Sequence, residues 1–178
     1  MKFKLRELAR KDLNIINSWR NDKDLISYLG ANYRYIDLEI DVAWFDNYLK
    51  ERNRTVRCSI VDESDTIIGL ISLTNIDYIN SSAELHIMIG NMANREKGIG
   101  QFAIQEILNH AFNNLNLHKV ELQVLCTNKR AIHVYEKVGF KQDGILRDAC
   151  FKNGEYLDMI VMSILKDEFS LKKEGLYE

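Results

Sequence analysis

Seven stretches of the chain alternate apolar and polar residues, or form short β-branched apolar runs, as β-strands do. These stretches are residues 2–8, 57–62, 66–77, 83–90, 119–125, 144–151 and 155–165. Asn153-Gly154 lies between the last two stretches, and this dipeptide is among the strongest short signals for a hairpin turn. Glu63-Ser64-Asp65 indicates a second hairpin turn earlier in the chain.

Apolar residues that recur every three or four positions predict helices between these strands. The helices are residues 12–19, 24–29, 37–51, 104–115 and 128–138. In the third helix, Ile40, Trp44 and Tyr48 are spaced by four residues, with Phe45 and Leu49 beside them, so we expect them to form its apolar face. The order of elements predicts an α+β or mixed α/β fold with a largely antiparallel sheet.

The composition is that of one globular domain, which we assign to residues 1–178: 46 % of the residues are hydrophobic and 28 % are charged. A net charge of −2 argues against a general nucleic-acid binder. No apolar run approaches membrane-spanning length, and the N-terminus lacks the apolar core of a signal peptide. We therefore expect a cytoplasmic protein with neither a nucleic-acid nor a membrane partner.

The three cysteines, Cys58, Cys126 and Cys150, are an odd number without the spacing of metal ligands. In an intracellular protein we expect them to be reduced and buried. No histidine–carboxylate spacing indicates a metal either, so the sequence predicts no metal site.

The stretch of residues 90–101, GNMANREKGIGQ, places two glycines where a helix begins, and Arg95 and Lys97 precede them. Backbone N–H groups and the helix dipole stabilise an anion at such a point, although a glycine turn can also be a simple boundary. No Walker string Gly-x4-Gly-Lys-Ser/Thr is present. The dinucleotide fingerprint, with Ala103 at its third position, fits poorly because several strands and helices come before it.

Two motifs together indicate a family. Arg95-x-x-Gly98-x-Gly100 is followed about thirty residues later by N-x-x-A-x-x-x-Y-x-x-x-G-F, which runs from Asn128 to Phe140, and this pair resembles the GNAT superfamily of N-acetyltransferases. Trp19-Arg20-Asn21 and NGEYLDMIVMSIL look like its branch of ribosomal-protein alanine, spermidine and amino-sugar acetyltransferases.

The resemblance implies a central, mostly antiparallel twisted sheet of about six to seven strands flanked by helices. It places acceptor-side helices at about 12–52, an acetyl-CoA-binding core at about 82–140 and a C-terminal hairpin at about 141–166. It also implies a splayed or bulged strand whose backbone serves the pantetheine and the thioester. The implied cofactor contacts are Ile87, Met88, Ile89, Arg95, Glu96, Lys97, Gly98, Ile99, Gly100, Gln101, Asn128, Ala131, Tyr135 and Lys137.

Tyr135 matches the family tyrosine that donates a proton to the departing thiolate, and a phenol with its usual pKa near 10 is protonated at neutral pH. Its position on an apolar helix face also fits a core tyrosine. Glu84 matches a glutamate that many relatives carry on this strand. It could take the amine's proton, directly or through water, or bind a cationic substrate. The alternative is that Glu84 is an exposed strand residue without a catalytic role. His86 shares its strand face and is a second candidate base.

The acceptor is less defined. The family places residues 28–36 and Trp44 beside the substrate. Asp37, Glu39 and Asp41 would suit a polyamine but equally complement a helix dipole, and aromatic residues near Arg34 would suit a sugar nucleotide. We expect an acetyl-CoA-dependent N-acetyltransferase acting on a primary amine, a small molecule (polyamine or amino sugar) in preference to a peptide N-terminus. A non-catalytic acyl-CoA sensor stays open, and the edge of the last hairpin could form a homodimer.

Overall fold

The computed structural model describes residues 3–90 and 98–169 of the 178-residue chain. It contains a seven-stranded sheet in the order β1-β2-β3-β4-β5-β7-β6, in which only the β4–β5 pair is parallel. The strands are β1 (Lys4–Glu7), β2 (Val56–Val61), β3 (Ile67–Asp77), β4 (Ser82–Ile89), β5 (Lys119–Leu125), β6 (Lys141–Lys152) and β7 (Glu155–Leu165). The predicted fold class and strand number are confirmed.

The helices also follow the predicted order. They are η1 (Arg10–Asp12), α1 (Leu13–Arg20), α2 (Lys23–Ser27), α3 (Leu38–Lys50), α4 (Ile99–Asn109), its π-helical continuation η3 (His110–Asn114) and α5 (Lys129–Val138). The predicted Asn153-Gly154 turn joins β6 to β7, with positive φ at both residues (51° and 88°), as a two-residue type I′ hairpin requires.

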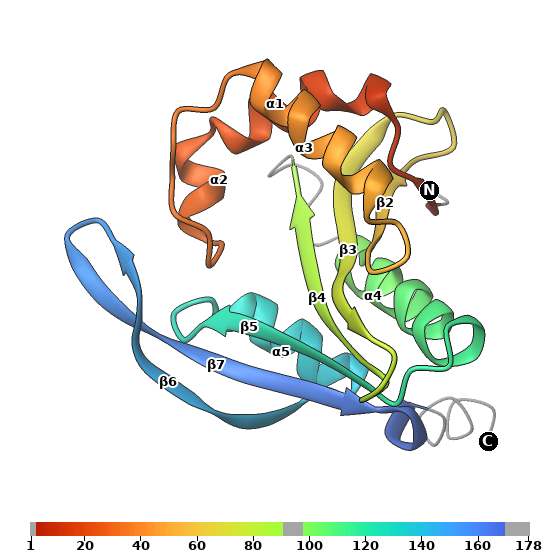
Figure 1. Cartoon of the computed structure of the whole chain (residues 1–178). Coiled ribbons are helices and arrows are strands. Elements are labelled where there is room, and N and C mark those ends of the chain that lie inside the picture. Colours follow the sequence, from red (N-terminus) through yellow and green to blue (C-terminus); the bar gives the residue numbers. More distant parts are fainter. Residues whose placement is uncertain (1–2, 91–97, 170–178) are drawn as a thin grey trace.

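The sheet splits between β4 and β5. These strands pair only through Ser82–Glu84 and Lys119–Glu121, and beyond that point they diverge (Figure 1). The register of β4 on β3 is continuous from Glu84 to Ile89, so β4 is splayed from its neighbour but not bulged over this segment. The divergence opens a gap in the hydrogen-bonded sheet at its centre.

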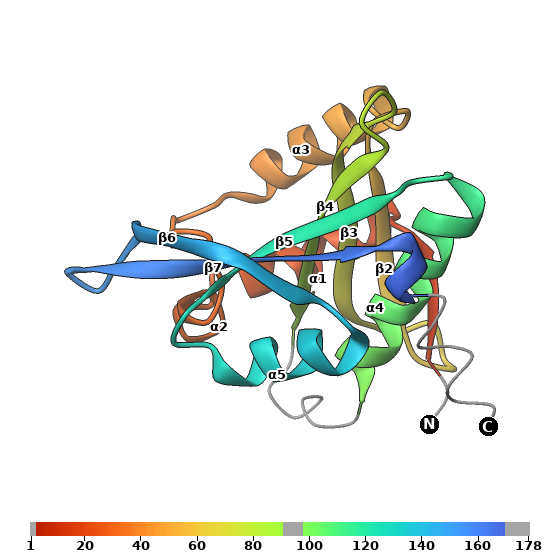
Figure 2. The same cartoon turned by 90° about the horizontal axis from the view of Figure 1, so that it is seen from below.

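Helices cover both faces of the sheet. α4 and α5 lie on one face, and α3 lies on the other (Figure 2). The larger core joins α4 and α5 to residues such as Ile71 and Leu85, whereas the N-terminal helices pack against Leu70 and Met88. Because side chains alternate along a strand, neighbouring residues of β3 and β4 serve the two different cores.

The apolar face predicted for α3 is confirmed for Phe45 and Tyr48 and is wrong for Ile40 and Leu49. Ile40 and Leu49 are 57 % and 48 % exposed, and the buried residues of the helix are Asp41, Phe45 and Tyr48. The helix is rotated because Asp41 is a buried ion-pair partner: it accepts hydrogen bonds from Arg20 of α1 and from Asn17 Nδ2 (2.7 Å).

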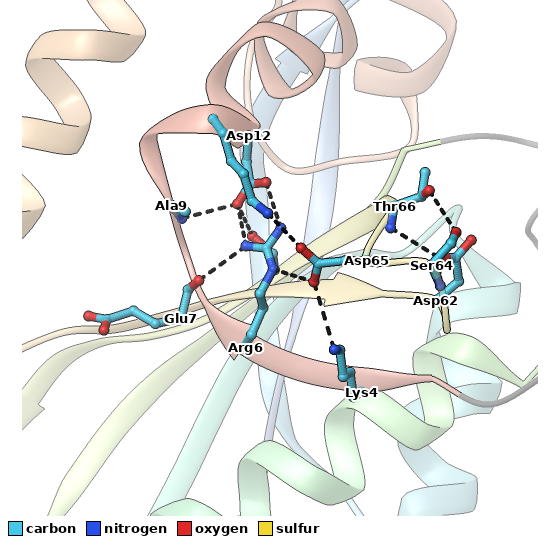
Figure 3. A network of polar contacts seen from close by, with 11 residues as sticks. Lys4, Arg6, Glu7, Ala9, Asp12, Asp62, Ser64, Asp65 and Thr66 are labelled. Carbon is cyan, nitrogen blue, oxygen red and sulfur yellow. Dashed lines mark hydrogen bonds and ion pairs between the residues drawn. The ribbon is translucent and has the colours of Figure 1, made fainter.

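A polar network joins the N-terminal helices to the sheet (Figure 3). Arg6 of β1 donates two hydrogen bonds to the buried carboxylate of Asp12 (2.7 and 2.8 Å), and Ser59 of β2 donates a third (2.7 Å). Arg6 also binds Asp65 in the β2–β3 turn (2.9 Å). Burial would raise the pKa of Asp12, but these hydrogen bonds outweigh it and hold that pKa below its usual value.

Three expectations from the sequence concern membrane-spanning helices, metal sites and the cysteines. Within residues 3–90 and 98–169, no helix is long and apolar enough to span a membrane. No group of three potential metal-ligating side chains is found in that part of the chain. Cys58, Cys126 and Cys150 are free thiols; Cys150 is buried and the other two are partly buried.

Candidate active site

A cleft of about 720 Å³ lies where β4 and β5 diverge. β4 contributes Ile87 and Ile89, and the rest of the wall comes from α2, the start of α4 and α5. Ten of the predicted contact residues line it: Ile87, Ile89, Gly98, Ile99, Gly100, Gln101, Asn128, Ala131, Tyr135 and Lys137. Arg95, Glu96 and Lys97 lie outside the described residues. The side chain of Met88 points to the opposite face, which leaves only its backbone for the predicted contact.

The N-terminus of α4 forms an open cradle. Gly98 is the N-cap residue with φ +74°, a left-handed conformation that favours glycine, and its carbonyl accepts the first helical hydrogen bond from Phe102. A Cβ placed on Gly98 or Gly100 would meet no atom within 4 Å. The first N–H groups of an 11-residue helix therefore face space that a phosphate group could occupy. These residues fit the pyrophosphate of coenzyme A.

Tyr135 projects from α5 into the cleft and is 8 % exposed. Its ring packs edge-on against Phe140, with 5.8 Å between the ring centroids. Burial raises the pKa of Tyr135 to about 12, and the hydroxyl has no hydrogen-bond partner among the residues that the structure describes. The side chain is therefore part of the core, as expected for a core tyrosine. Its hydroxyl nevertheless keeps its proton at neutral pH and can donate it to a ligand.

The segment that follows α2 is attached beside the cleft, and its Tyr28 and Leu29 line the wall. Asn128 caps α5 by accepting from the Ala131 N–H (3.2 Å), and its Nδ2 donates to the carbonyl of Tyr28 (2.9 Å). Lys152, from the tip of the β6–β7 hairpin, donates to the carbonyls of Ile26 (3.0 Å) and Ala31 (2.6 Å). Asn128 is therefore a helix cap that also fixes the loop beside the cleft.

The opposite face of β4 carries Glu84 and His86. Asn75 of β3 donates to Glu84 Oε2 (3.1 Å), while Glu84 Oε1 lies 3.5 Å from His86 Nε2. His86 Nε2 also lies 3.0 Å from Thr74 Oγ1. The predicted sharing of one strand face is confirmed, and the sheet separates this pair from the side chains that line the cleft.

Trp44 and the three carboxylates near it have mainly internal partners. The Trp44 ring stacks on the guanidinium of Arg57, at 4.8 Å from the ring centroid. Asp37 caps α3 by accepting from the Glu39 N–H (2.9 Å), and Asp41 is ion-paired with Arg20. Two of the three acidic side chains at this helix start therefore stabilise the helix and its packing.

The sequence analysis missed several lining residues. They are Leu25, Ile104, Thr127, Lys129, Arg130, His133 and Val134, whereas Tyr28 and Leu29, which also line the cleft, belong to the segment 28–36 that was expected beside the substrate. The basic pair Lys129-Arg130 falls inside the recognised N-x-x-A motif, and that position could have signalled a contact with an anionic ligand. Leu25 carried no such signal, because only the packing of α2 over the cleft brings it there.

Comparisons with known proteins agree with this geometry. The sequence profile of the acetyltransferase (GNAT) domain matches residues 2–141. The spermidine N(1)-acetyltransferase of Vibrio cholerae is 34 % identical over 171 residues, 96 % of each chain. That of Escherichia coli is 29 % identical over 166 residues, which cover 93 % of this chain and 87 % of the relative. The crystal structure of spermidine N-acetyltransferase from Vibrio cholerae with CoA and spermine has a TM-score of 0.88 at 33 % identity and covers 94 % of this chain and 98 % of that chain.

Proposed function

The chain belongs to the GNAT acetyltransferase family, and on that premise we propose that it transfers an acetyl group from acetyl-CoA to a primary amine of a polyamine such as spermidine. Membership of this family implies that the enzyme depends on acetyl-CoA and that its acceptor is an amine. The choice of a polyamine is supported by relatives that match almost the whole chain and are named for spermidine. A small-molecule amine was also the preferred acceptor from the sequence.

The observation that carries the proposal is the cleft at the divergence of β4 and β5, with the α4 N-terminus at one side and Tyr135 in its wall. When bound, acetyl-CoA supplies an activated acetyl thioester. Gly98 and Gly100 leave room for its pyrophosphate against free backbone N–H groups. Tyr135 holds a proton that can be given to the sulfur of the leaving thiolate.

On the other face of β4, Glu84 and His86 are the candidates to take the proton of the acceptor amine, and Glu84 can also hold a cationic substrate. Both tasks suit a carboxylate that is fixed by Asn75 and remains partly accessible to solvent. β4 and β5 are no longer paired beyond Glu84, and we propose that the amine reaches the thioester across this unpaired stretch.

The proposal is tested by thiol release from acetyl-CoA with a panel of amines. The panel contains spermidine, spermine, an amino sugar, a sugar nucleotide with a free amine, and peptides with free N-termini. We expect fast release with spermidine and none with its acetylated form. Release with a peptide alone would replace the polyamine by a protein N-terminus. Binding of acetyl-CoA without release for any amine would favour a non-catalytic sensor.

A further inference from the structure

Four side chains form a polar cluster on the acceptor face of the sheet, outside the acetyl-CoA cleft. Glu84 and His86 come from β4, and Thr74 and Asn75 come from β3. Asn75 has a left-handed backbone (φ 52°) where the β3–β4 register shifts, and this turn directs its amide to Glu84 Oε2. Glu84 is thereby anchored through one oxygen, while its other oxygen faces the imidazole.

The contacts favour one tautomer of His86. Glu84 Oε1 (3.5 Å) and Thr74 Oγ1 (3.0 Å) both lie near Nε2, and the carboxylate can only accept a hydrogen bond. A proton on Nε2 satisfies that arrangement. Nδ1 then carries the lone pair, and it has no hydrogen-bond partner among residues 3–90 and 98–169. Since 54 % of the side chain is exposed, Nδ1 can reach a ligand from solvent.

The position of His86 suits an acceptor amine. β4 leaves β5 after Glu84, so His86 stands beside the gap in the sheet, on the face opposite Ile87 and Ile89, which line the cleft. The edge of β4 at His86 is therefore not paired with β5, in contrast to its edge at Glu84.

The surroundings of His86 lower the pKa of the ring and so favour its neutral form. Burial lowers its pKa below the usual 6.5, Glu84 partly offsets this, and the cation of Arg57 on β2 lowers it further. Arg57 reaches the same face beside Ser72 and is stacked under Trp44 of α3. An imidazole that is neutral at pH 7 can accept a proton.

We propose that His86 is the residue that takes the proton from the acceptor amine, with Glu84 as the positioning residue that orients the imidazole and Asn75 holding Glu84 in place. This inference rests on the proposed acetyl transfer. The Nδ1 lone pair accepts one proton as the amine nitrogen bonds to the acetyl carbon. The resulting imidazolium is stabilised by the Glu84 carboxylate, as in other carboxylate–histidine pairs, and then gives the proton to solvent.

The first experiment compares turnover with spermidine across pH 5–9 in the wild type, His86→Gln, Glu84→Gln and His118→Gln. His118 is exposed and takes no part in the hydrogen bonds of the cluster, so it is the matched control. We expect His86→Gln to lower kcat about 100-fold at pH 7, to lose the acid limb of the wild-type profile and to leave acetyl-CoA binding unchanged. Glu84→Gln keeps an acid limb, moved to lower pH because the carboxylate no longer raises the pKa of His86.

The inference would be overturned if His86→Gln kept the wild-type kcat and an unchanged acid limb of the pH profile. If only Glu84→Gln lost the acid limb, Glu84 would be the residue that takes the amine's proton. Failure of the wild type to acetylate any amine would instead refute the proposed function. A second measurement is independent of the acceptor: ¹⁵N NMR of the His86 ring should show a proton on Nε2 at neutral pH and a pKa below 6.5. A proton on Nδ1 would contradict the assignment.

Discussion

At the scale of single residues, we propose Tyr135 as the proton donor and Gly100 as a contact of the cofactor. Neither assignment depends on the acceptor, because both residues line the β4–β5 cleft. Each can be altered with little disturbance of the fold: phenylalanine keeps the ring of Tyr135, and the space beside Gly100 is open.

Tyr135→Phe should lower kcat about 100-fold with little change in acetyl-CoA affinity, because only the proton donor is removed. With a pKa of about 12, Tyr135 stays protonated to about pH 11, so it should produce no basic limb in the pH profile below that value. Steady-state kinetics and a cofactor titration check this. Unchanged turnover would remove the assignment of Tyr135 as the acid.

Gly100→Asp should weaken acetyl-CoA binding at least about tenfold, since the side chain would occupy the cradle and repel a pyrophosphate. Gly144→Asp is the matched control, because Gly144 on β6 also has open space beside it and is not among the residues that line the cleft. Titration calorimetry compares the two. Equal affinities in both variants would argue against a phosphate site at the α4 N-terminus.

At the scale of elements, two non-local attachments hold the parts of the site together. The β6–β7 hairpin fastens the α2–α3 segment through Lys152 and through Cys150, whose Sγ lies 3.4 Å from the Gly30 carbonyl. The Asp12 network fastens the N-terminal helices to β1 and β2 (Figure 3). Both position the loops that surround the cleft.

Lys152→Met keeps the aliphatic stem of the side chain but removes two hydrogen bonds to loop carbonyls. Each such bond contributes about 1 kcal/mol, so amide hydrogens of residues 28–37 should exchange about tenfold faster or more. Hydrogen exchange with mass spectrometry measures this, with Lys141→Met as the control for an exposed ion pair. Equal exchange in the two variants would mean that the hairpin does not hold the loop.

Asp12→Asn should lower the free energy of unfolding by about 3 kcal/mol near neutral pH, because Arg6 would lose its buried carboxylate partner. The folded-state pKa of Asp12 is lowered, so its contribution is present above the unfolded value near 4 and is lost as the pH falls below it. Denaturant titrations at pH 7 and pH 3 should therefore show a smaller difference from the wild type at pH 3. Asp46→Asn, in a more exposed pair with Arg10, should cost less than about 1 kcal/mol.

The periodicity of apolar residues predicted the helices and strands better than it predicted the contacts between them. The alternation of β4 placed Glu84 and His86 on the correct face because the strand is regular there. The face of α3 was partly wrong because a buried Asp41, paired with Arg20 of another helix, has no local signature. The contacts of Lys152 and Asn128 with the α2–α3 segment span about a hundred residues or more and could not be read from periodicity.

At the scale of the whole molecule, the two family motifs predicted where the cofactor cleft would lie, and the order of elements predicted the sheet. Periodicity could not predict the divergence of β4 and β5, which depends on how long two distant strands stay paired, and only the resemblance to the family implied a splayed strand. The sequence also could not identify the acceptor amine, because the acceptor face is assembled from β2, β3, β4 and α3.

Ile145 and Leu146 are exposed on the edge strand β6, the surface that could form a homodimer according to the sequence analysis.

The most direct test of the account is to incubate the purified chain with acetyl-CoA and spermidine and to measure both products by mass spectrometry. We predict one acetylated spermidine for each free coenzyme A, at a rate that falls in Tyr135→Phe. Release of coenzyme A without an acetylated polyamine would contradict the proposed acceptor. Absence of both products, with no binding of acetyl-CoA, would contradict the assignment of the β4–β5 cleft itself.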